Sequence, residues 1–545
     1  MKNIQKKPFG STIRKNSSYQ SVLQKTVLSI CCLLIISIVC IQTAGAGSMY
    51  TIADQTGDWG MPSPYGHYPR GPGYIRMSLV FDTLLWKDAK GLVSDLASSW
   101  QFNKEENSYL FTLREGVSWH DGQPFSARDV AFTFEYIKKH PYKWVDGSVV
   151  KRVEVINDQT VKLVLSKKYA PFLHCIAATM PILPEHIMRN IDSPVTFRES
   201  VALIGTGPYK VVDYNKQQGT YLYQANSDYR MGRPIFDRIR FIKMRQEMYA
   251  TALQRGRINA GQVPAEIADS LKQKGFTVLA GPHDWVAKMT INHKKGVLAN
   301  RQFRHALAAA IDRQALVDIC QRGFALAGGN GLLPSDNRWF SKVTDNDPYD
   351  LNRASRIIEG LGYVKKDRFY EKDGKLLQFE LLMSGSGQRT QGHPGEREAE
   401  LIRDQLALAG IKITLRSLDP KTLDAMIKNW KFDLALSGHG GLGGDPASVN
   451  RFIAGKSFNS ARYAKNTQLN AFMQQQVGET KEHERKQLLG EIQGLYAYEM
   501  PALPLYYPTW FWAFDNRADL FYTDRGIAIG VPLPLNKLSF VDMDN

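Results

Sequence analysis

The segment 119–129 places a tryptophan, a histidine, two aspartates and a glycine close together, as a metal site or an acid/base pair would. A metal site needs a second ligand at a suitable spacing, and His120 beside Asp121 has none three or four residues away. Local structural roles account for the pattern. Asp121-Gly122 is a turn dipeptide, and Ser126 with Asp129 forms a capping box that opens a helix. We therefore expect a turn and a helix start here, not a metal or catalytic centre.

Strand-like and helix-like segments alternate along the chain, without an internal repeat or a low-complexity stretch. Val153–Ile156 and Val161–Leu165 have the pattern of strands. Arg301–Cys320 and Glu396–Ala409 place apolar residues on one helical face, and Gly410 follows the second as a candidate C-cap. This mixed order predicts an α/β chain with several sheets.

The N-terminal residues 1–46 resemble an export signal in composition. Six basic residues precede the uncharged apolar run Val27–Ile41, and Ala44-Gly45-Ala46 follows it. This order is typical of a signal peptide cleaved after Ala46. Because no charge occurs between Lys25 and Asp54, an uncleaved membrane anchor is the alternative. In both cases we expect a periplasmic or cell-surface protein, exported from the cytoplasm.

Charge and cysteine content exclude some classes of protein. The 69 Lys and Arg outnumber the 53 Asp and Glu, but six of the basic residues lie in the N-terminal segment and the rest are spread along the chain. This distribution argues against a nucleic-acid binder. After the apolar run only Cys175 and Cys320 remain, and they either form a disulfide or stay as two buried thiols.

A strand that runs into five glycines is the most informative stretch for ligand binding. It reads Gly438-His439-Gly440-Gly441-Leu442-Gly443-Gly444, and Asp445-Pro446 follows as the expected N-cap and first residue of a helix. Glycines let backbone approach a ligand closely, and free amides at a helix start can receive a carboxylate or phosphate. The alternative is a tight connection that needs positive φ angles. No Gly-Lys-Ser/Thr follows, so we expect no nucleotide loop.

Trp119–Val130 resembles the signature segment of the family 5 extracellular solute-binding proteins, the peptide and nickel receptors of ABC importers. Further segments resemble the family in the same order along the chain: 81–85, 96–100, 205–209, 226–229, 304–313, 432–436 and 500–506. Jointly these segments are highly specific, and they span nearly all of residues 50–522.

The resemblance implies a two-lobed periplasmic binding protein fold (type II) of α/β class, with an extra domain inserted in lobe I and a hinge between the lobes. The expected division is 47–83, 200–284 and 505–545 for lobe I, 84–199 for the inserted domain, and 285–504 for lobe II. The chain would cross between lobes near Pro282 and near Pro504, where a few residues absorb the rotation.

The resemblance also implies a ligand site. Peptide receptors of the family use an aspartate in the glycine loop to pair with the peptide's amine, and Leu442 stands at that position here. A leucine cannot neutralise an ammonium, which favours a blocked peptide, a sugar, a chelate or a small anion, unless Asp445 substitutes. The residues that we expect to bind the ligand are Arg70, Tyr74, Tyr142, Trp144, His439, Gly440, Gly441, Leu442, Gly443, Asp445, Tyr506 and Tyr507.

The scattered histidines show no ligand spacing, so we expect no protein metal site and no cofactor, although a chelate contacted by His439 fits. We expect a monomeric receptor, not an enzyme, that captures an oligopeptide or peptide-like solute and delivers it to the permease and ATPase subunits of an importer. A receptor for a nickel or other metal chelate, or for an oligosaccharide, is the alternative. A secreted hydrolase and an anchored chaperone or sensor are further classes, but the chain has no Gly-x-Ser-x-Gly and no His-Glu-x-x-His.

Overall fold

The computed structural model describes residues 48–342, 347–385 and 394–543. The chain divides into two compact units, Met1–Met49 and Tyr50–Asn545, and the fold below is that of the second. The predicted signal segment 1–46 lies outside the described residues. Within those that are described, no helix is long and apolar enough to cross a membrane.

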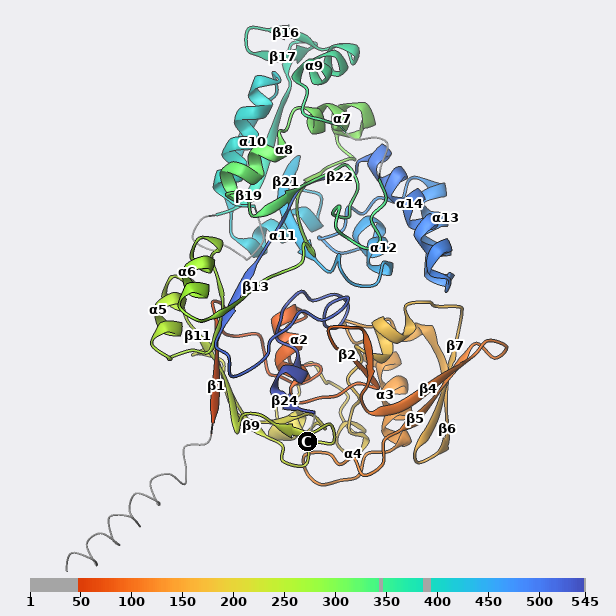
Figure 1. Cartoon of the computed structure of the whole chain (residues 1–545). Coiled ribbons are helices and arrows are strands. Elements are labelled where there is room, and N and C mark those ends of the chain that lie inside the picture. The colour runs from red at the N-terminus through yellow and green to blue at the C-terminus, as the bar shows by residue number, and fades with distance from the viewer. Residues whose placement is uncertain (1–47, 343–346, 386–393, 544–545) are drawn as a thin grey trace, which may run out of the picture. The chain divides into compact units, whose positions relative to one another are not determined.

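The first large sheet has seven strands (Figure 1). Their order is β13 (Thr277–Ala280), β23 (Phe511–Phe514), β12 (Ala260–Val263), β1 (Met49–Asp54), β11 (Arg238–Lys243), β9 (Thr220–Ala225) and β8 (Tyr209–Asn215). β1 runs parallel to β12, whereas β13 with β23, β23 with β12, β11 with β9, and β9 with β8 are antiparallel pairs. We call the part of the chain built on this sheet lobe I. Its helices include α2 (Gly71–Ser78), α5 (Tyr249–Gln254) and α6 (Ala268–Gln273).

The second large sheet has six strands and forms lobe II. Their order is β15 (Ala325–Ala327), β22 (Ala502–Pro508), β14 (Trp285–Ile291), β21 (Leu434–Gly440), β19 (Gln378–Ser384) and β20 (Lys412–Leu418). The helices of this lobe are α7 (Arg301–Ala309), α8 (Arg313–Ala315), α9 (Leu351–Gly360), α10 (Glu396–Leu408), α11 (Pro420–Lys428), α12 (Ala447–Ala454), α13 (Thr467–Gly478) and α14 (Glu482–Glu499). α10 packs on β19 and β20, and α13 packs on α14 (Figure 1).

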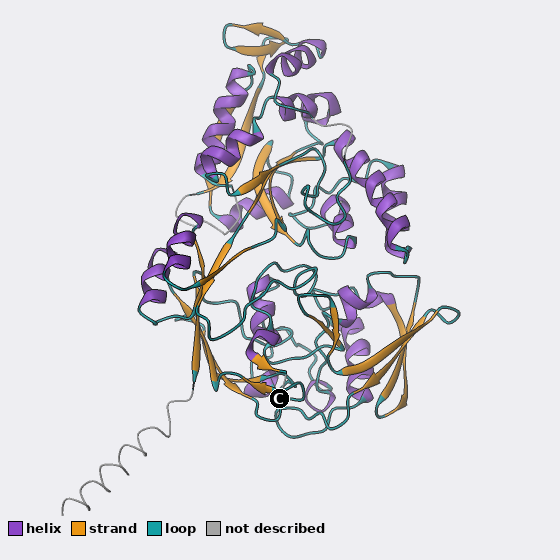
Figure 2. Ribbon diagram, viewed as in Figure 1, coloured by secondary structure: helices purple, strands orange, loops and turns teal. Residues whose placement is uncertain are grey.

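A four-stranded antiparallel sheet forms a third part, which we call the inserted domain. Its strands are β4 (Ala97–Asn103), β5 (Ser108–Leu113), β7 (Thr160–Leu165) and β6 (Val150–Asn157), and α3 (Ala127–Lys139) covers one side of it (Figure 2). The helical turn Leu173–Ala177 and the short helix α4 (Glu185–Met188) follow. Each of the three parts has its own hydrophobic core.

Small sheets complete the fold. They pair β2 (Leu85–Lys87) with β3 (Leu92–Ser94), β10 (Arg233–Pro234) with β24 (Val541–Asp542), and β17 (Phe369–Lys372) with both β16 (Val364–Lys366) and β18 (Lys375–Leu376).

Several local predictions are confirmed. The Ser126 hydroxyl accepts a hydrogen bond from the Arg128 amide, and the Asp129 carboxylate accepts one from the Ser126 amide, so the capping box opens α3. Gly122 has φ +87°, as the predicted turn requires. The predicted helix 396–409 is present as α10, and Gly410 ends it with φ +77°.

Other local predictions are wrong in their bounds. The expected helix 301–320 is broken after Ala309, because the Asp312 carboxylate accepts a hydrogen bond from the Ala315 amide and starts a new helix. The predicted division at 504/505 cuts through β22, which belongs to the lobe II sheet. The second passage between the lobes therefore lies after Pro508, not near Pro504.

Four buried charges join the inserted domain to lobe I. Lys537 donates to Asp82 and, at 2.8 Å, to Asp95, while Arg230 pairs with the same two carboxylates. Burial disfavours ionisation of Asp82, but Arg230 and Lys537 outweigh it and hold its pKa well below the usual range. Because Asp95 lies between β3 and β4, this cluster fixes the small sheets against the C-terminal segment.

We predict that Lys537→Met destabilises the protein by about 3–5 kcal/mol, because it leaves two buried carboxylates with one cation. Lys272→Met is the matched control, since Lys272 makes only a surface pair with Asp269 and its loss is expected to change stability by less than about 0.5 kcal/mol. Urea unfolding of both variants measures the difference. Equal effects of the two substitutions would contradict the role given to the buried cluster.

Candidate functional site

The glycine loop 440–444 joins β21 to α12 and lies against the backbone of lobe I. A Cβ at Gly444 would stand 2.7 Å from the carbonyl oxygen of Ile529, and one at Gly530 would stand 3.0 Å from the Cα atoms of Gly441 and Gly444. Gly441 and Gly530 also have φ angles of +92° and +109°. The glycines are therefore needed for a backbone contact between the lobes, in addition to the predicted turn.

Asp445 is already engaged by the protein. Its carboxylate forms a forked ion pair with the Arg485 guanidinium, at 2.6 and 3.0 Å, and accepts a hydrogen bond from the Ala447 amide at 2.9 Å. The side chain is buried, and the helix starts one residue later than predicted, at Ala447. An amine of a ligand would have to compete with Arg485 for this carboxylate.

Leu442 points into a hydrophobic core of lobe II. It is 2% exposed and packs in a cluster that includes Val286, Trp339 and Phe452. Its backbone carbonyl accepts a hydrogen bond from the Asn337 amide group at 3.0 Å. The leucine at this position therefore has a packing role, and contact of its side chain with a ligand stays a prediction.

His439 lies within β21, opposite Val286 of β14, and is 2% exposed. Its ring stacks on that of Phe452, with centroids 3.7 Å apart. The ring is thus held by packing, which leaves little surface for the predicted contact with a chelate.

The predicted aromatic residues of lobe I and the inserted domain come together in one cluster around His67. The Tyr142 hydroxyl and His67 Nε2 are 3.1 Å apart, and the rings of Tyr74 and Trp144 have centroids 5.1 Å apart. Tyr74 and Tyr142 are buried, and the Tyr74 hydroxyl donates to the Thr179 carbonyl. Trp144 is half-buried, and its Nε1 has no hydrogen-bond partner among the residues described, so it is the member of this cluster best suited to receive a ligand.

Tyr506 and Tyr507 lie on β22 and are both buried in lobe II. The Tyr506 hydroxyl is 3.2 Å from a Glu398 oxygen, and the Tyr507 hydroxyl donates to the Leu332 carbonyl at 3.1 Å. These partners belong to lobe II, so the prediction that the two tyrosines are lobe I residues is wrong.

Arg70 is exposed and immediately precedes α2. It lies close enough to Asp424 of α11 to affect its ionisation: burial raises the pKa of Asp424 to about 6, and the charge of Arg70 opposes this rise. The predicted arginine of lobe I therefore faces a half-buried carboxylate of lobe II.

Asp284 is a candidate that the sequence interpretation missed. It lies where the chain passes from β13 to β14, and its carboxylate occupies the space that a side chain at Gly443 would need. Burial, with Asp336 adding, raises the pKa of Asp284 to about 7, and its side chain has no hydrogen bond or ion pair within the described part of the chain. Nearby, the buried Tyr522 hydroxyl also lacks a partner there. The available sequence signal was its place two residues after Pro282, where the chain was expected to cross between the lobes.

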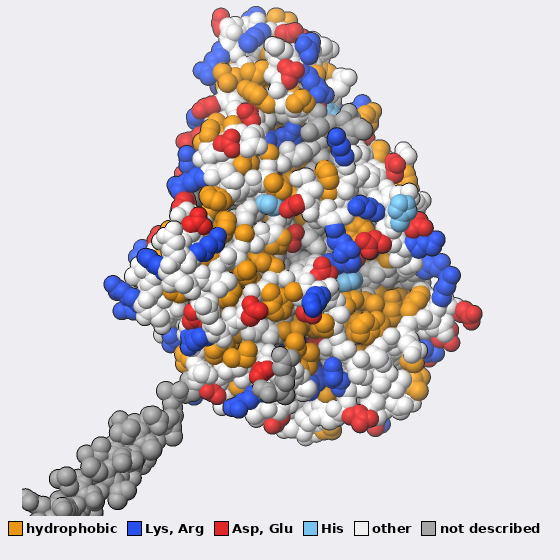
Figure 3. All heavy atoms as spheres, in the orientation of Figure 1, with side chains coloured by type: hydrophobic (Ala, Val, Ile, Leu, Met, Phe, Trp, Pro, Cys, Tyr) orange, Lys and Arg blue, Asp and Glu red, His pale blue; other side chains and the backbone are white. Residues whose placement is uncertain are grey.

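A group of basic residues lies beside the glycine loop. Arg451 projects from α12, and its Nη2 would be 3.5 Å from a Cβ at Gly441. Lys87 is buried and donates to the Ala528 carbonyl, and burial lowers its pKa to about 8. On the face shown in Figure 3, basic, acidic and histidine side chains gather near α12. None of these basic residues was among the predicted ligand contacts.

Cys175 and Cys320 are free thiols, so of the two alternatives left by the sequence, the structure has two separate cysteines and no disulfide between them. Among the described residues, no group of three or more His, Cys, Asp or Glu side chains is placed to hold a metal.

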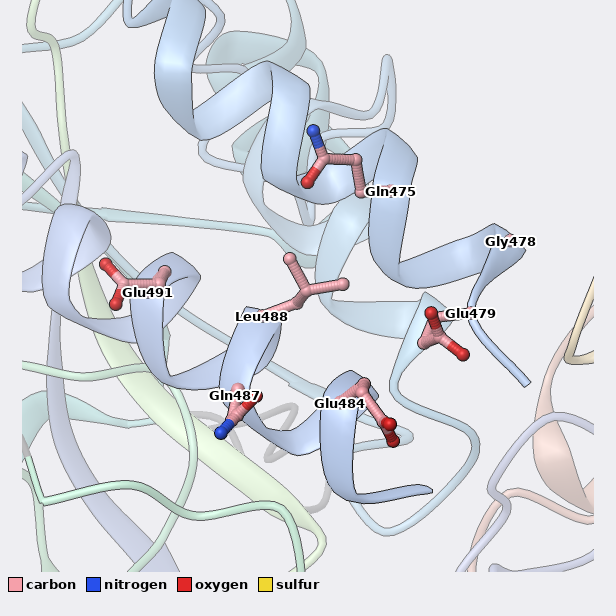
Figure 4. Close-up of a pocket in the computed structure, with 7 residues that line it drawn as sticks. All are labelled: Gln475, Gly478, Glu479, Glu484, Gln487, Leu488 and Glu491. Atoms are coloured by element: carbon pink, nitrogen blue, oxygen red, sulfur yellow. The ribbon is translucent and has the colours of Figure 1, made fainter. Parts of the chain in front are cut away.

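A hollow lies between α13 and α14 (Figure 4), and none of the predicted site residues is among those that line it. It is lined by Gln475, Gly478, Glu479, Glu484, Gln487, Leu488 and Glu491. With its acidic rim and single apolar side chain it lacks the apolar walls of a solute pocket, and we give it no role in binding.

Two α/β lobes joined by two chain passages, with polar groups of both lobes beside a glycine loop, define a two-lobed solute-binding protein. The chain belongs to the bacterial extracellular solute-binding proteins, family 5, whose family model matches residues 91–460.

Relatives with different ligands in their names are similar to this chain. Heme-binding protein A of Haemophilus influenzae is 26% identical over 443 residues, covering 75% of this chain and 78% of that protein. The oligopeptide-binding protein AppA of Bacillus subtilis is 27% identical over 428 residues, covering 74% and 75%. The structure of NikZ from Campylobacter jejuni in complex with Ni(L-His) superposes with a TM-score of 0.74 at 23% identity, covering 88% of this chain and 97% of NikZ.

We predict that Asp284→Asn raises stability at pH 8 and has little effect at pH 4. Because the folded protein holds a proton on Asp284 that the unfolded chain loses near pH 4, this group lowers stability as pH rises from about 4 to about 7. The shift corresponds to at most about 4 kcal/mol at pH 8.

Thermal unfolding of solute-free protein between pH 4 and 8 measures this effect. Asp404→Asn serves as the control, because Asp404 is an exposed carboxylate of α10. A stability difference between Asp284→Asn and wild type that stayed constant over this range would contradict the assignment.

Proposed function

We propose that this protein is the extracytoplasmic receptor of an ABC importer, which captures an oligopeptide or peptide-like solute between its lobes and delivers it to the permease and ATPase subunits. Membership of a solute-binding family and the two-lobed fold support this role. We propose a location in the periplasm or at the cell surface, and attachment to the membrane only through the permease or an uncleaved N-terminal anchor.

The observation that carries the proposal is the contact of the glycine loop with residues 529–530. It brings Asp284 and Arg451 to the two sides of the same loop, and neither side chain has an ion-pair partner among the described residues. A solute that touches both lobes favours the arrangement in which they meet, and only such a difference in affinity can shift the population.

The class of ligand is inferred from which charged side chains near the loop are already paired within the protein. Asp445 is paired with Arg485 and Leu442 is packed in a core, so an amine would not be recognised by a carboxylate of the loop itself. Asp284 offers a carboxylate beside the same loop. The peptide-binding relative AppA supports a peptide-like solute, and the names of the heme-binding protein and NikZ support a metal chelate as the alternative. An oligosaccharide is the other alternative.

We propose that the protein has no catalytic role, in keeping with a family of transport receptors. Turnover of peptide or glycoside substrates by the purified chain would favour the hydrolase alternative instead.

We predict that Gly444→Ala weakens solute binding by about 1–3 kcal/mol, because the added methyl group would overlap the Ile529 carbonyl where the lobes meet. The φ angle at Gly444 is not positive, so the substitution adds bulk without backbone strain. Gly494→Ala is the matched control, since a methyl group there would meet nothing within 4 Å. Native mass spectrometry compares retained solute in the two variants, and equal retention would contradict lobe closure at this contact.

We predict that native purification of the exported protein yields a bound solute, released on unfolding, whose masses match a series of short peptides. Mass spectrometry before and after unfolding, with metal analysis of the same sample, identifies it. A single compound, or a metal released in stoichiometric amount with a chelator, would replace the peptide proposal by the chelate or sugar alternative.

A further inference from the structure

Arg451 is a cation without a counter-ion at the edge of the proposed solute site. Within the described residues, no carboxylate lies within ion-pair distance of its guanidinium, and no hydrogen bond from its side chain is present. The guanidinium lies against Gly441, where any larger residue would contact its Nη2, and over the ring of Phe452 at 4.8 Å. A glycine at position 441 therefore leaves one side of Arg451 uncovered by a neighbouring side chain.

The acids around Arg525, at the lobe I side of this region, are already paired with cations. Asp445 holds Arg485 in a forked pair, Glu482 accepts from Arg338 at 2.9 Å, and Asp524 lies 3.7 Å from Arg525. In the described part of the chain, Lys87 and Arg451 have no carboxylate partner, and the side chain of Lys87 donates to the Ala528 carbonyl. The local charge is thus positive, even though acidic residues are present.

Segments of both lobes and of the inserted domain meet here. Gly441 lies against both Arg451 and the Ile529 carbonyl, Lys87 of β2 donates to the neighbouring Ala528 carbonyl, and β2 packs on the turn Leu173–Ala177. In keeping with this arrangement, the charges of Lys87, Arg485 and Arg451 oppose the rise that burial and Asp445 cause in the pKa of the Cys175 thiol. The neighbouring His174 is neutral, because burial together with Arg525 and Lys87 lowers its pKa to about 3. Its Nδ1 is buried and has no partner among the described residues.

We propose that Arg451 and His174 form a subsite that binds a carboxylate of the solute, with Lys87 as a buried supporting charge. This inference rests on the proposed function and specifies which part of the solute is recognised. Arg451 supplies forked donors that suit a carboxylate, and the neutral imidazole supplies an N–H from Nδ1. The Arg451 side chain is exposed, so a carboxylate can reach its guanidinium from solvent.

The subsite differs from the expected contacts of the loop. Its residues come from α12 of lobe II and from the turn 173–177 of the inserted domain. A carboxylate bound there would therefore contact both lobe II and the inserted domain. It lies on the Gly441 side of the loop, whereas Asp284 lies on the Gly443 side. A solute with an acid group at one end and an amine at the other would match both charges.

Two libraries of random tetrapeptides without Asp and Glu test the proposal, one with free C-termini and one with C-terminal amides. The exported full-length protein is stripped of bound solute, refolded and incubated with each library, and native mass spectrometry measures the bound fraction. We expect wild type to bind the acids at least tenfold better than the amides. Arg451→Gln should reduce this ratio to about twofold or less, and Arg451→Lys should give an intermediate value because it keeps the charge without the fork.

Arg403→Gln is the matched control, because Arg403 lies on α10 of the same lobe and pairs only with the exposed Asp404. It should keep the wild-type ratio. A third library contains Glu but ends in C-terminal amides, so its only carboxylates are side chains. If wild type binds this library and Arg451→Gln does not, the subsite is supported, and the carboxylate that it binds comes from a side chain.

The subsite would be overturned if wild type bound peptides with free and amidated C-termini equally well and showed no preference for the Glu library. The proposal of a peptide receptor would then still stand. Retention of the wild-type ratio by Arg451→Gln would overturn the subsite as well. Binding of no member of any library by wild type would instead remove the peptide proposal, and the subsite with it. If Arg451→Gln fails to fold, the ratio of bound free-acid to amidated peptides in wild type and in Arg451→Lys tests the subsite instead.

Discussion

The close approach of two backbone segments, residues 440–444 and 529–530, is the constraint on which the site depends. Because a Cβ at Gly530 would stand 3.0 Å from the Cα atoms of Gly441 and Gly444, a side chain at these glycines would meet the backbone of the other lobe. The contact sets the distance between α12 and the C-terminal segment of lobe I, and thereby decides which charges of the two lobes face each other. Glycine appears in this loop because the turn at residues 529–530 needs the space, and the proposed solute benefits from the same clearance.

Charge pairing around this contact determines what remains for a solute. The protein satisfies most of its buried carboxylates internally: Asp82 and Asp95 with Lys537 and Arg230, and Asp445 with Arg485. These pairs cost desolvation and serve to fix the parts of the chain against one another. Among the residues that the structure describes, Asp284 and Arg451 have no such partner. A site that closes on a ligand needs groups of this kind, since an internal partner would have to be displaced before binding.

Patterns within one element could be predicted from the sequence, and pairings between distant residues could not. The capping box at Ser126, the turn at Gly122 and the helix α10 depend on neighbours within a few residues, so their sequence signals were sufficient. The family resemblance added the fold. The break after Ala309 was missed because apolar periodicity continues across it, although Asp312 was the available signal for a new helix start. The division at 504/505 was misplaced because the apolar run of β22 gives no sign of which sheet it joins.

The site residues show the same limit more sharply. Tyr74, Tyr142, Tyr506 and Tyr507 were predicted to bind the ligand. All four are buried, and their hydroxyls are bonded or close to partners inside the protein. Asp284 and Arg451 lie in no recognisable sequence motif. They stand out only because the fold gives them no charged partner among the described residues. Arg485 lies 40 positions from Asp445, and only the fold shows that it removes this carboxylate from the loop. A binding site of this type is defined by the charges that remain after the internal pairs have formed, and therefore the complete set of pairs must be known before the ligand class can be argued.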